Sequence, residues 1–122
     1  SGLALVFFVF EKASNRLVGG ITLGHIRHGV AMSGQIGYWV GEPFAGNGYM
    51  TDAVRTLVQY SFGKLGLHRL EAACIPSNLR SVRVLEKAGF AQEGLLKSYL
   101  KINGKWQDHL LFARISGVTD GD

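Results

Sequence analysis

A glycine-rich stretch between two regular segments is the part of this sequence best suited to bind a ligand. Residues 41–52 read GEPFAGNGYMTD and lie between an apolar run ending at Val40 and a helical pattern beginning near Met50. Glycines at such a turn let the backbone approach a ligand closely, and the helix start adds unpaired N–H donors and partial positive charge. This combination favours a phosphate or pyrophosphate. The pair Gly46 and Gly48 is also typical of an ordinary strand-to-helix turn, so both interpretations stay open.

Two familiar phosphate-binding loops do not fit the sequence. No Lys-Ser or Lys-Thr pair follows the glycines at P-loop spacing, and the third glycine and distal acidic residue of a dinucleotide fold are missing. The four histidines and the single Cys74 show no metal-ligand spacing, so we expect no metal site. Cys74 lies in the apolar run LEAACI, which favours a buried strand residue over a nucleophile.

Length and composition predict one folded domain. The chain has 122 residues, of which 47% are hydrophobic, so a packed core is expected. We expect a single domain over residues 1–116 and a flexible tail over residues 117–122. The net charge of +4 fits an anionic ligand. One cysteine is typical of the reducing cytoplasm, and the longest apolar run, Leu3 to Phe10, is too short to cross a membrane.

Hydrophobic periodicity predicts the order of helices and strands. One helix is expected from Met50 to the glycines at 63 and 66, and a second from Pro76 to Gly89. The apolar stripe expected on the second helix consists of Leu79, Val82, Leu85 and Ala88. Strands are expected over residues 3–10, 17–25, 35–40, 68–75, 95–102 and 105–115.

The strand pattern predicts the fold class. The strand over residues 3–10 is apolar on both faces, which predicts a central strand covered on both sides. Asn103-Gly104 between the last two strands is typical of a tight hairpin. The strands over 35–40 and 68–75 are joined by a helix and should lie parallel. The order therefore predicts an α+β (mixed α/β) fold, in which helices flank a mixed sheet.

Three segments of the chain carry a family resemblance. They are GYWVGEPFAGNGYMTDAV, EAACIPSNLRSVRVLEKAGFAQEG and YLKINGKWQDHLLFA. Together they resemble the GNAT N-acetyltransferase superfamily, and within it the RimJ/RimL-type ribosomal-protein N-terminal acetyltransferases. The resemblance covers most of residues 17–115. It implies a GNAT-like splayed mixed sheet and acetyl-CoA as the acetyl donor. The acetyl group would pass to a primary amine, most often a protein N-terminal amine, by direct attack.

The resemblance also implies a set of cofactor-binding residues. The strand over 35–40 would form the pantetheine wall, and the glycine turn would cradle the pyrophosphate. Asn78 would contact the cofactor, although a helix N-cap is an equal interpretation. Ser81 would protonate the departing CoA thiolate as a general acid, the alternative being an exposed helix serine. The wall and cradle residues are Ile36, Gly37, Tyr38, Trp39 and Val40, and Ala45, Gly46, Asn47, Gly48 and Tyr49.

Two positions depart from the family pattern. Pro43 stands where the superfamily often has Arg or Gln, so the cradle would rest on backbone donors and the helix dipole. Leu100 stands where RimL-like proteins have a Glu, which leaves the general base open. Asp108 and Glu42 are tentative bases, but a structural hydrogen bond within the hairpin is an alternative for Asp108. His109 is a further candidate, but it and Asp108 should point to opposite strand faces, so at most one faces the cleft. Packing is the favoured interpretation of three other candidates, His25, Tyr38 and Tyr99.

The resemblance sets the expected partners as well. The family's first strand and helices would precede Leu3 and are absent here, so exposed apolar surface near residues 3–10 predicts self-association. The expected acceptor is a protein N-terminus, that of a ribosomal protein included, or a small amine. The basic residues are spaced like solvated helix faces, so no direct nucleic-acid role is expected. The alternative function is a non-catalytic CoA-binding or ribosome-associated module.

Overall fold

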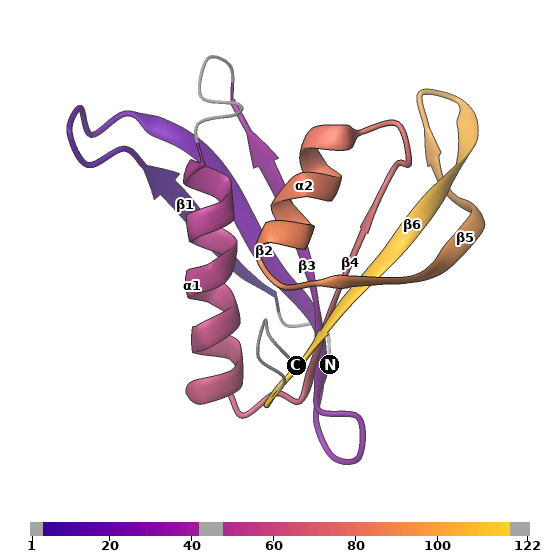
Figure 1. The fold of residues 1–122 in the computed structure, drawn as a ribbon, viewed down its shortest axis with the longest axis horizontal. Coiled ribbons are helices and arrows are strands. Elements are labelled where there is room, and N and C mark those ends of the chain that lie inside the picture. Colours follow the sequence, from indigo (N-terminus) through magenta and orange to yellow (C-terminus); the bar gives the residue numbers. More distant parts are fainter. Residues whose placement is uncertain (1–3, 42–47, 118–122) are drawn as a thin grey trace.

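The computed structural model describes residues 4–41 and 48–117 (Figure 1). Within them, the strands form one sheet in the order β1-β2-β3-β4-β6-β5. Both helices lie on the same face of this sheet (Figure 1), so the expected mixed α+β fold is confirmed. The elements are β1 (Leu5–Phe10), β2 (Leu17–Arg27), β3 (Ser33–Val40), α1 (Tyr49–Gly63), β4 (Arg69–Cys74), α2 (Leu79–Lys87), β5 (Ala91–Ile102) and β6 (Lys105–Ile115).

The pairing of β3 with β4 is short. The two strands run parallel, as predicted, but they pair only at Ser33–Arg69, Gly34–Leu70 and Gln35–Glu71. Beyond these pairs β3 follows β2, whereas β4 follows β6. The two strands therefore separate toward their carboxyl ends, and α2 lies over the split (Figure 1). This is the splayed sheet that the family resemblance implied.

The core lies between the helices and the sheet. Helix α1 buries Met50, Val54, Leu57 and Val58, which recur at the predicted helical spacing. The sheet contributes alternate residues to the same cluster, because side chains in a strand alternate between faces. Its buried members include Ile21, Leu23, Ile36, Leu70, Ala72 and Phe112. No helix among the described residues is long and apolar enough to cross a membrane.

The expected central position of the first strand is wrong. Within the described residues β1 lies at the end of the sheet and pairs only with β2. Leu5 and Val9 pack against the core, but Val6 and Phe8 on the opposite face are 57% and 62% exposed. An apolar run predicts that both faces are covered, but it carries no information about which neighbours would cover them. The predicted self-association of this region stays a prediction.

The second helix begins later than expected. Asn78 is its N-cap and Leu79 its first residue, whereas the sequence suggested a start at Pro76. Leu79 is 61% exposed, so its place in the predicted apolar stripe is wrong. It lies in the first turn, beyond the part of the helix that covers the sheet. Leu85 and Ala88 are fully buried, as predicted.

The terminal hairpin has the predicted turn. Asn103 and Gly104 have φ values of 50° and 80°, the left-handed conformation that a two-residue type I′ turn requires. The pairing of β5 with β6 is irregular between Leu96 and Leu100, and Ser98 in that interval has φ 45°. The irregularity bends β5 locally, because extra residues on one strand increase its twist.

Gly19 is predicted to be essential for close packing of β2 on β3. A Cβ atom at this position would lie 2.1 Å from the carbonyl oxygen of Trp39. We expect Gly19→Ala to lower the free energy of unfolding by about 1–3 kcal/mol, since the strands must move apart. Gly94→Ala is the control, because a Cβ there meets nothing within 4 Å among the described residues. Urea unfolding measures both, and equal losses would contradict the prediction.

Candidate active site

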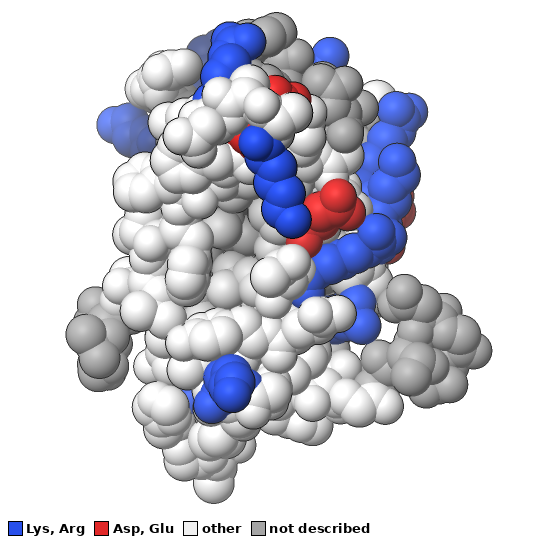
Figure 2. All heavy atoms as spheres, turned by 90° about the vertical axis from the view of Figure 1, so that its left-hand side faces the viewer, with Lys and Arg blue, Asp and Glu red and all other residues white. Residues whose placement is uncertain are grey.

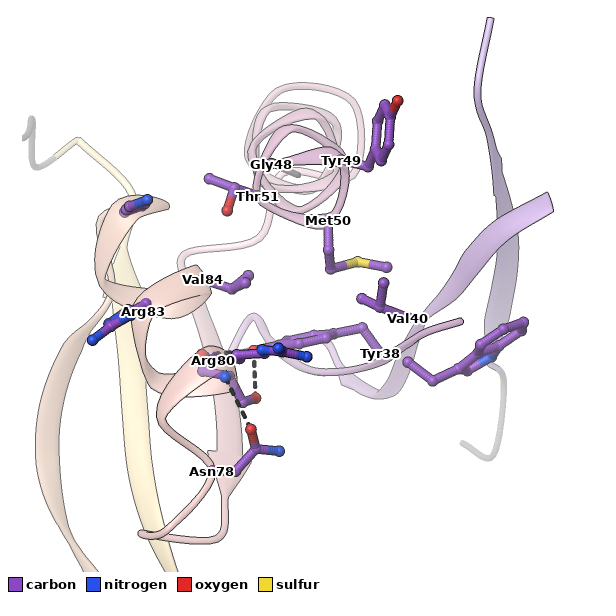
Figure 3. A pocket seen from close by; sticks show the side chains of 13 residues that line it. Tyr38, Val40, Gly48, Tyr49, Met50, Thr51, Asn78, Arg80, Arg83 and Val84 are labelled. Atoms are coloured by element: carbon purple, nitrogen blue, oxygen red, sulfur yellow. Dashed lines mark hydrogen bonds between the residues drawn. The ribbon is translucent and has the colours of Figure 1, made fainter. Parts of the chain in front are cut away.

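A cavity of about 380 Å³ lies where β3, the start of α1 and α2 meet (Figure 3). It opens on the separated part of β3, beyond the last pair with β4. The lining residues are Tyr38, Trp39 and Val40 from β3, Gly48, Tyr49, Met50 and Thr51 from the start of α1, and Asn78, Arg80, Ser81, Arg83, Val84 and Lys87 from α2 and its cap. Three segments that are distant in sequence thus form one site.

The start of α1 faces this cavity. Gly48 is the N-cap, with φ 82°, and it has no side chain to occupy the first N–H groups of the helix. These donors and the positive end of the helix dipole favour an anion. Of the predicted cradle, Gly48 and Tyr49 line the cavity. Ala45, Gly46, Asn47 and the tentative base Glu42 lie outside the described residues.

Tyr49 lines the cavity but directs its hydroxyl elsewhere. The phenol donates to the carboxylate of Glu11. This hydrogen bond raises the pKa of Tyr49. The hydroxyl of Ser14 and the phenol of Tyr49 both lower the pKa of Glu11, Ser14 more strongly. Tyr49 therefore ties the start of α1 to the turn between β1 and β2.

The start of α2 places Asn78 and Ser81 together. The Oδ1 atom of Asn78 accepts from the backbone N–H of Ser81 at 3.2 Å, which confirms the N-cap interpretation. The NH₂ group of the Asn78 amide is not used by this cap, and the residue also lines the cavity. Ser81 itself is half-buried.

Tyr38 and Ser81 form a hydrogen-bonded pair across the split. The hydroxyl of Tyr38 lies 2.7 Å from Ser81 Oγ and 2.9 Å from the Ser81 carbonyl oxygen (Figure 3). The phenol has one proton for these two acceptors. When it donates to the Ser81 carbonyl oxygen, which can only accept, Ser81 Oγ donates to the phenol oxygen, and the pair fixes the serine side chain at the cavity. Burial raises the pKa of Tyr38 to about 12, so this phenol keeps its proton and is a donor rather than a base.

The cavity is strongly basic on its α2 side. Arg80, Arg83 and Lys87 line it, and none of the described lining residues is acidic. Arg55 of α1 donates to the carbonyl of Lys87 at 2.8 Å and joins the two helices. In Figure 2, Lys and Arg side chains are spread over the visible face, with several of them toward its right-hand side. These lining residues were not predicted from the sequence, because basic residues at this spacing are typical of a solvated helix face. Their spacing on one helix, directly after Asn78, was the available signal.

A second cavity, of about 270 Å³, lies at the same split. Ile36, predicted for the pantetheine wall, lines this cavity together with Leu100, where RimL-like proteins have a Glu. Gly37 lines neither cavity, and its carbonyl accepts from the hydroxyl of Thr22 at 3.3 Å. The predicted wall therefore runs from the second cavity at Ile36 to the first at Val40.

The hairpin candidates for a base are held in structural contacts. Asp108 is exposed and accepts from the backbone N–H of Ser98 at 2.9 Å, within the bent part of β5. His109 is 4% exposed, and its Nδ1 lies 3.1 Å from the carbonyl oxygen of Gln107. Neither residue lines a cavity. The geometry supports the structural interpretation of Asp108, and its role as a base stays a prediction.

Comparison with known proteins agrees with this geometry. A family model described as an acetyltransferase (GNAT) domain matches residues 1–91. "Probable N-acetyltransferase YjcK" of Bacillus subtilis (strain 168) is 46% identical over 88% of this chain and 59% of its own length. The [Ribosomal protein uS5]-alanine N-acetyltransferase of Escherichia coli (strain K12) is 32% identical over 92% of this chain and 58% of its own length. The chain thus spans less than two thirds of these curated relatives.

Two solved structures share the fold. The ribosomal-protein-S5-alanine acetyltransferase from Vibrio fischeri superimposes with a TM-score of 0.89 at 36% identity, over 94% of this chain and 63% of that one. Mycobacterium smegmatis RimJ, solved in complex with CoA-disulfide, has a TM-score of 0.84 at 40% identity, over 91% of this chain and 53% of that one. The match over most of the chain, together with the splayed sheet, shows that the chain belongs to the GNAT acetyltransferase family.

Proposed function

We propose that this chain binds acetyl-CoA and transfers its acetyl group to a primary amine, foremost a protein N-terminal amine. The observation that carries the proposal is the Tyr38–Ser81 pair, which lies in a basic cavity at the split between β3 and β4. A proton donor, an anion site and an unpaired strand backbone meet there. These are the elements that a reaction releasing an anionic thiolate needs.

The residues present fit the parts of CoA. The first N–H groups of α1 suit the pyrophosphate, because a helix N-terminus binds anions. The β4-facing backbone of residues 36–40 has no strand partner within the described residues, so it can bond the amides of pantetheine. Arg83 and Lys87 suit the remaining phosphate, on the ribose. When bound, acetyl-CoA supplies an activated acetyl group as a thioester.

The roles of the side chains follow from their contacts. Ser81 gives a proton to the departing sulfur, and Tyr38 holds the serine side chain at the cavity through the 2.7 Å contact between the two hydroxyl groups. Positioning of both reactants supplies a large part of the rate. Relatives are named as acetylating ribosomal-protein alanine, ribosomal-protein serine and spermidine, which supports a protein N-terminus, with a small amine second. The cytoplasmic location stays a prediction.

A non-catalytic CoA-binding module is the alternative function. Leu100 favours it, since this position holds an apolar side chain where RimL-like proteins have a carboxylate. The two functions differ in one measurement, which is acetyl transfer to a panel of N-terminal peptides. Binding of acetyl-CoA without transfer to any amine would support the module.

Ser81→Ala is predicted to reduce turnover without reducing cofactor affinity. We expect kcat to fall by about 10²-fold, because general-acid assistance is lost. The dissociation constant of CoA should stay within about twofold, since no charge is removed. Tyr38→Phe should cause a smaller loss of kcat, because the hydroxyl acts through Ser81. Thiol release and calorimetry measure the two quantities.

Ser77→Ala serves as the control for this experiment. Ser77 is exposed, lies directly before the N-cap Asn78 and lines neither cavity. Its variant should match the unmodified protein in both measurements. A Ser81→Ala protein with unchanged kcat would remove Ser81 from the mechanism.

The basic side chains of α2 are predicted to recognise the ribose phosphate. We expect the double variant Arg83→Ala, Lys87→Ala to bind CoA about tenfold more weakly, a loss of about 1.4 kcal/mol. Its affinity for dephospho-CoA, which lacks that phosphate, should change by less than about twofold. Calorimetry gives both constants, and Lys101→Ala, on the distant hairpin, is the control. An equal loss for both ligands would place these side chains elsewhere on the cofactor.

A further inference from the structure

The second cavity lies on the sheet face that points away from the helices. Gln35, Glu71 and Ala73 line it, and each stands next to a residue buried in the core on the other face. Side chains of neighbouring residues in a strand point to opposite faces, so these three point away from α1 and α2. The first cavity opens among the helices, whereas the second opens on the opposite side of the same split.

The two cavities are adjacent along β3. Ile36 lines the second cavity and Tyr38 the first. Two residues of strand span roughly 7 Å, so a group held between them is accessible from both sides. An acetyl thioester whose sulfur faces Ser81 would therefore present its carbonyl carbon toward the second cavity. This step rests on the function proposed above.

A bulge in β2 turns His25 into the second cavity. Between Gly24 and Arg27, β2 advances three residues while β3 advances two, from Gln35 to Ser33. His25 has φ 49° at this point, and Ile26 packs against the core in its place. A regular strand would have pointed His25 at the core, on the same face as Leu23. Left-handed backbone at a non-glycine residue and bulges that re-aim a side chain are both typical of functional sites.

The first cavity is lined by basic side chains, whereas the described lining of the second includes a carboxylate and no basic side chain. Its titratable side chains are His25 from β2, Glu71 from β4 and Tyr99 from β5, and no Lys or Arg is among its described lining residues. Glu71 accepts from Arg69 at 2.8 Å, and the ring of Tyr99 lies edge-on to His109 at 5.4 Å. His25 is exposed and has no hydrogen-bond partner among the described residues. It is therefore the group most accessible for proton transfer.

We propose that the second cavity receives the acceptor amine as an ammonium ion and that His25 takes its proton. The ammonium gives one proton to the imidazole, and the neutral nitrogen attacks the thioester carbonyl carbon. A C–N bond forms and the C–S bond breaks. Ser81 gives its hydroxyl proton to the sulfur and regains one from water, while the nitrogen and the imidazole each release one proton to water. The net products are the acetylated amine, the CoA thiol and one proton.

The first experiment compares His25→Asn with His28→Asn over a range of pH. Asn tolerates the left-handed backbone at position 25 but cannot take up a proton. His28 is exposed and lines neither cavity, so its variant should behave as the unmodified protein. With an alanyl peptide as acceptor, we expect His25→Asn to lower kcat/KM by about 10²-fold near pH 7. The loss should shrink above about pH 8, where a free α-amino group already lacks the proton. A loss that stays constant with pH, or no loss, would overturn the role of His25.

The second experiment tests the amine site without turnover. Trialanine with a free amino terminus is titrated into the CoA-loaded, ¹⁵N-labelled protein, and amide shifts are followed by NMR. We expect shifts around His25, Ala73 and Tyr99, weaker shifts with N-acetylated trialanine, and no shifts in the variant Leu100→Arg, which places a positive charge in the cavity. Shifts confined to other surfaces would overturn the site. Calorimetry of CoA binding tests the proposed function alone. Tight CoA binding without these shifts would therefore overturn the amine site and leave the proposed function standing, whereas loss of CoA binding would overturn the proposed function.

Discussion

The parallel pairing between β3 and β4 ends early, and both cavities lie where it ends. Three residue pairs hold the strands together, and each strand then continues along a different neighbour. A complete ladder would use the backbone groups of residues 36–40 for internal hydrogen bonds. The split instead leaves the β4-facing groups of these residues without a strand partner among the described residues, and both cavities lie beside it.

The two cavities differ in charge because different elements reach them. Helix α2 brings basic side chains to one, together with the positive end of α1. The strands bring His25 and Glu71 to the other. Under the proposed function, an anionic donor and a cationic acceptor would have separate approaches to a common point between Ile36 and Tyr38. One sheet would then bind both reactants without placing their charges in the same solvent-accessible space.

Much of this arrangement was predictable from the sequence, and the exceptions have physical reasons. The α1 stripe, the Asn103-Gly104 turn and the parallel β3–β4 pair follow from local periodicity and turn chemistry. The edge position of β1 does not, because an apolar run carries no information on its neighbours. The Tyr38–Ser81 pair joins residues 43 positions apart, so only the folded chain shows that contact. His25 was ambiguous because a bulge, which periodicity does not show, decides its face.

Arg69 does not line the second cavity, but it holds the carboxylate of Glu71, which does. This side chain lies in the last paired region of β3 and β4 and binds both Glu71 and Glu93, at 2.8 and 2.6 Å. The guanidinium of Arg69 lowers the pKa of Glu93 and anchors the Glu71 carboxylate at the foot of the cavity. Arg69 and Glu71 both belong to β4, and Glu93 of the second strand over, β5, holds the same guanidinium, so the position of the Glu71 carboxylate is fixed. Under the proposed function, the net negative charge of Arg69 with its two glutamates would repel polypeptides that begin with Asp or Glu, so an ion pair that stabilises the sheet would also select among acceptors.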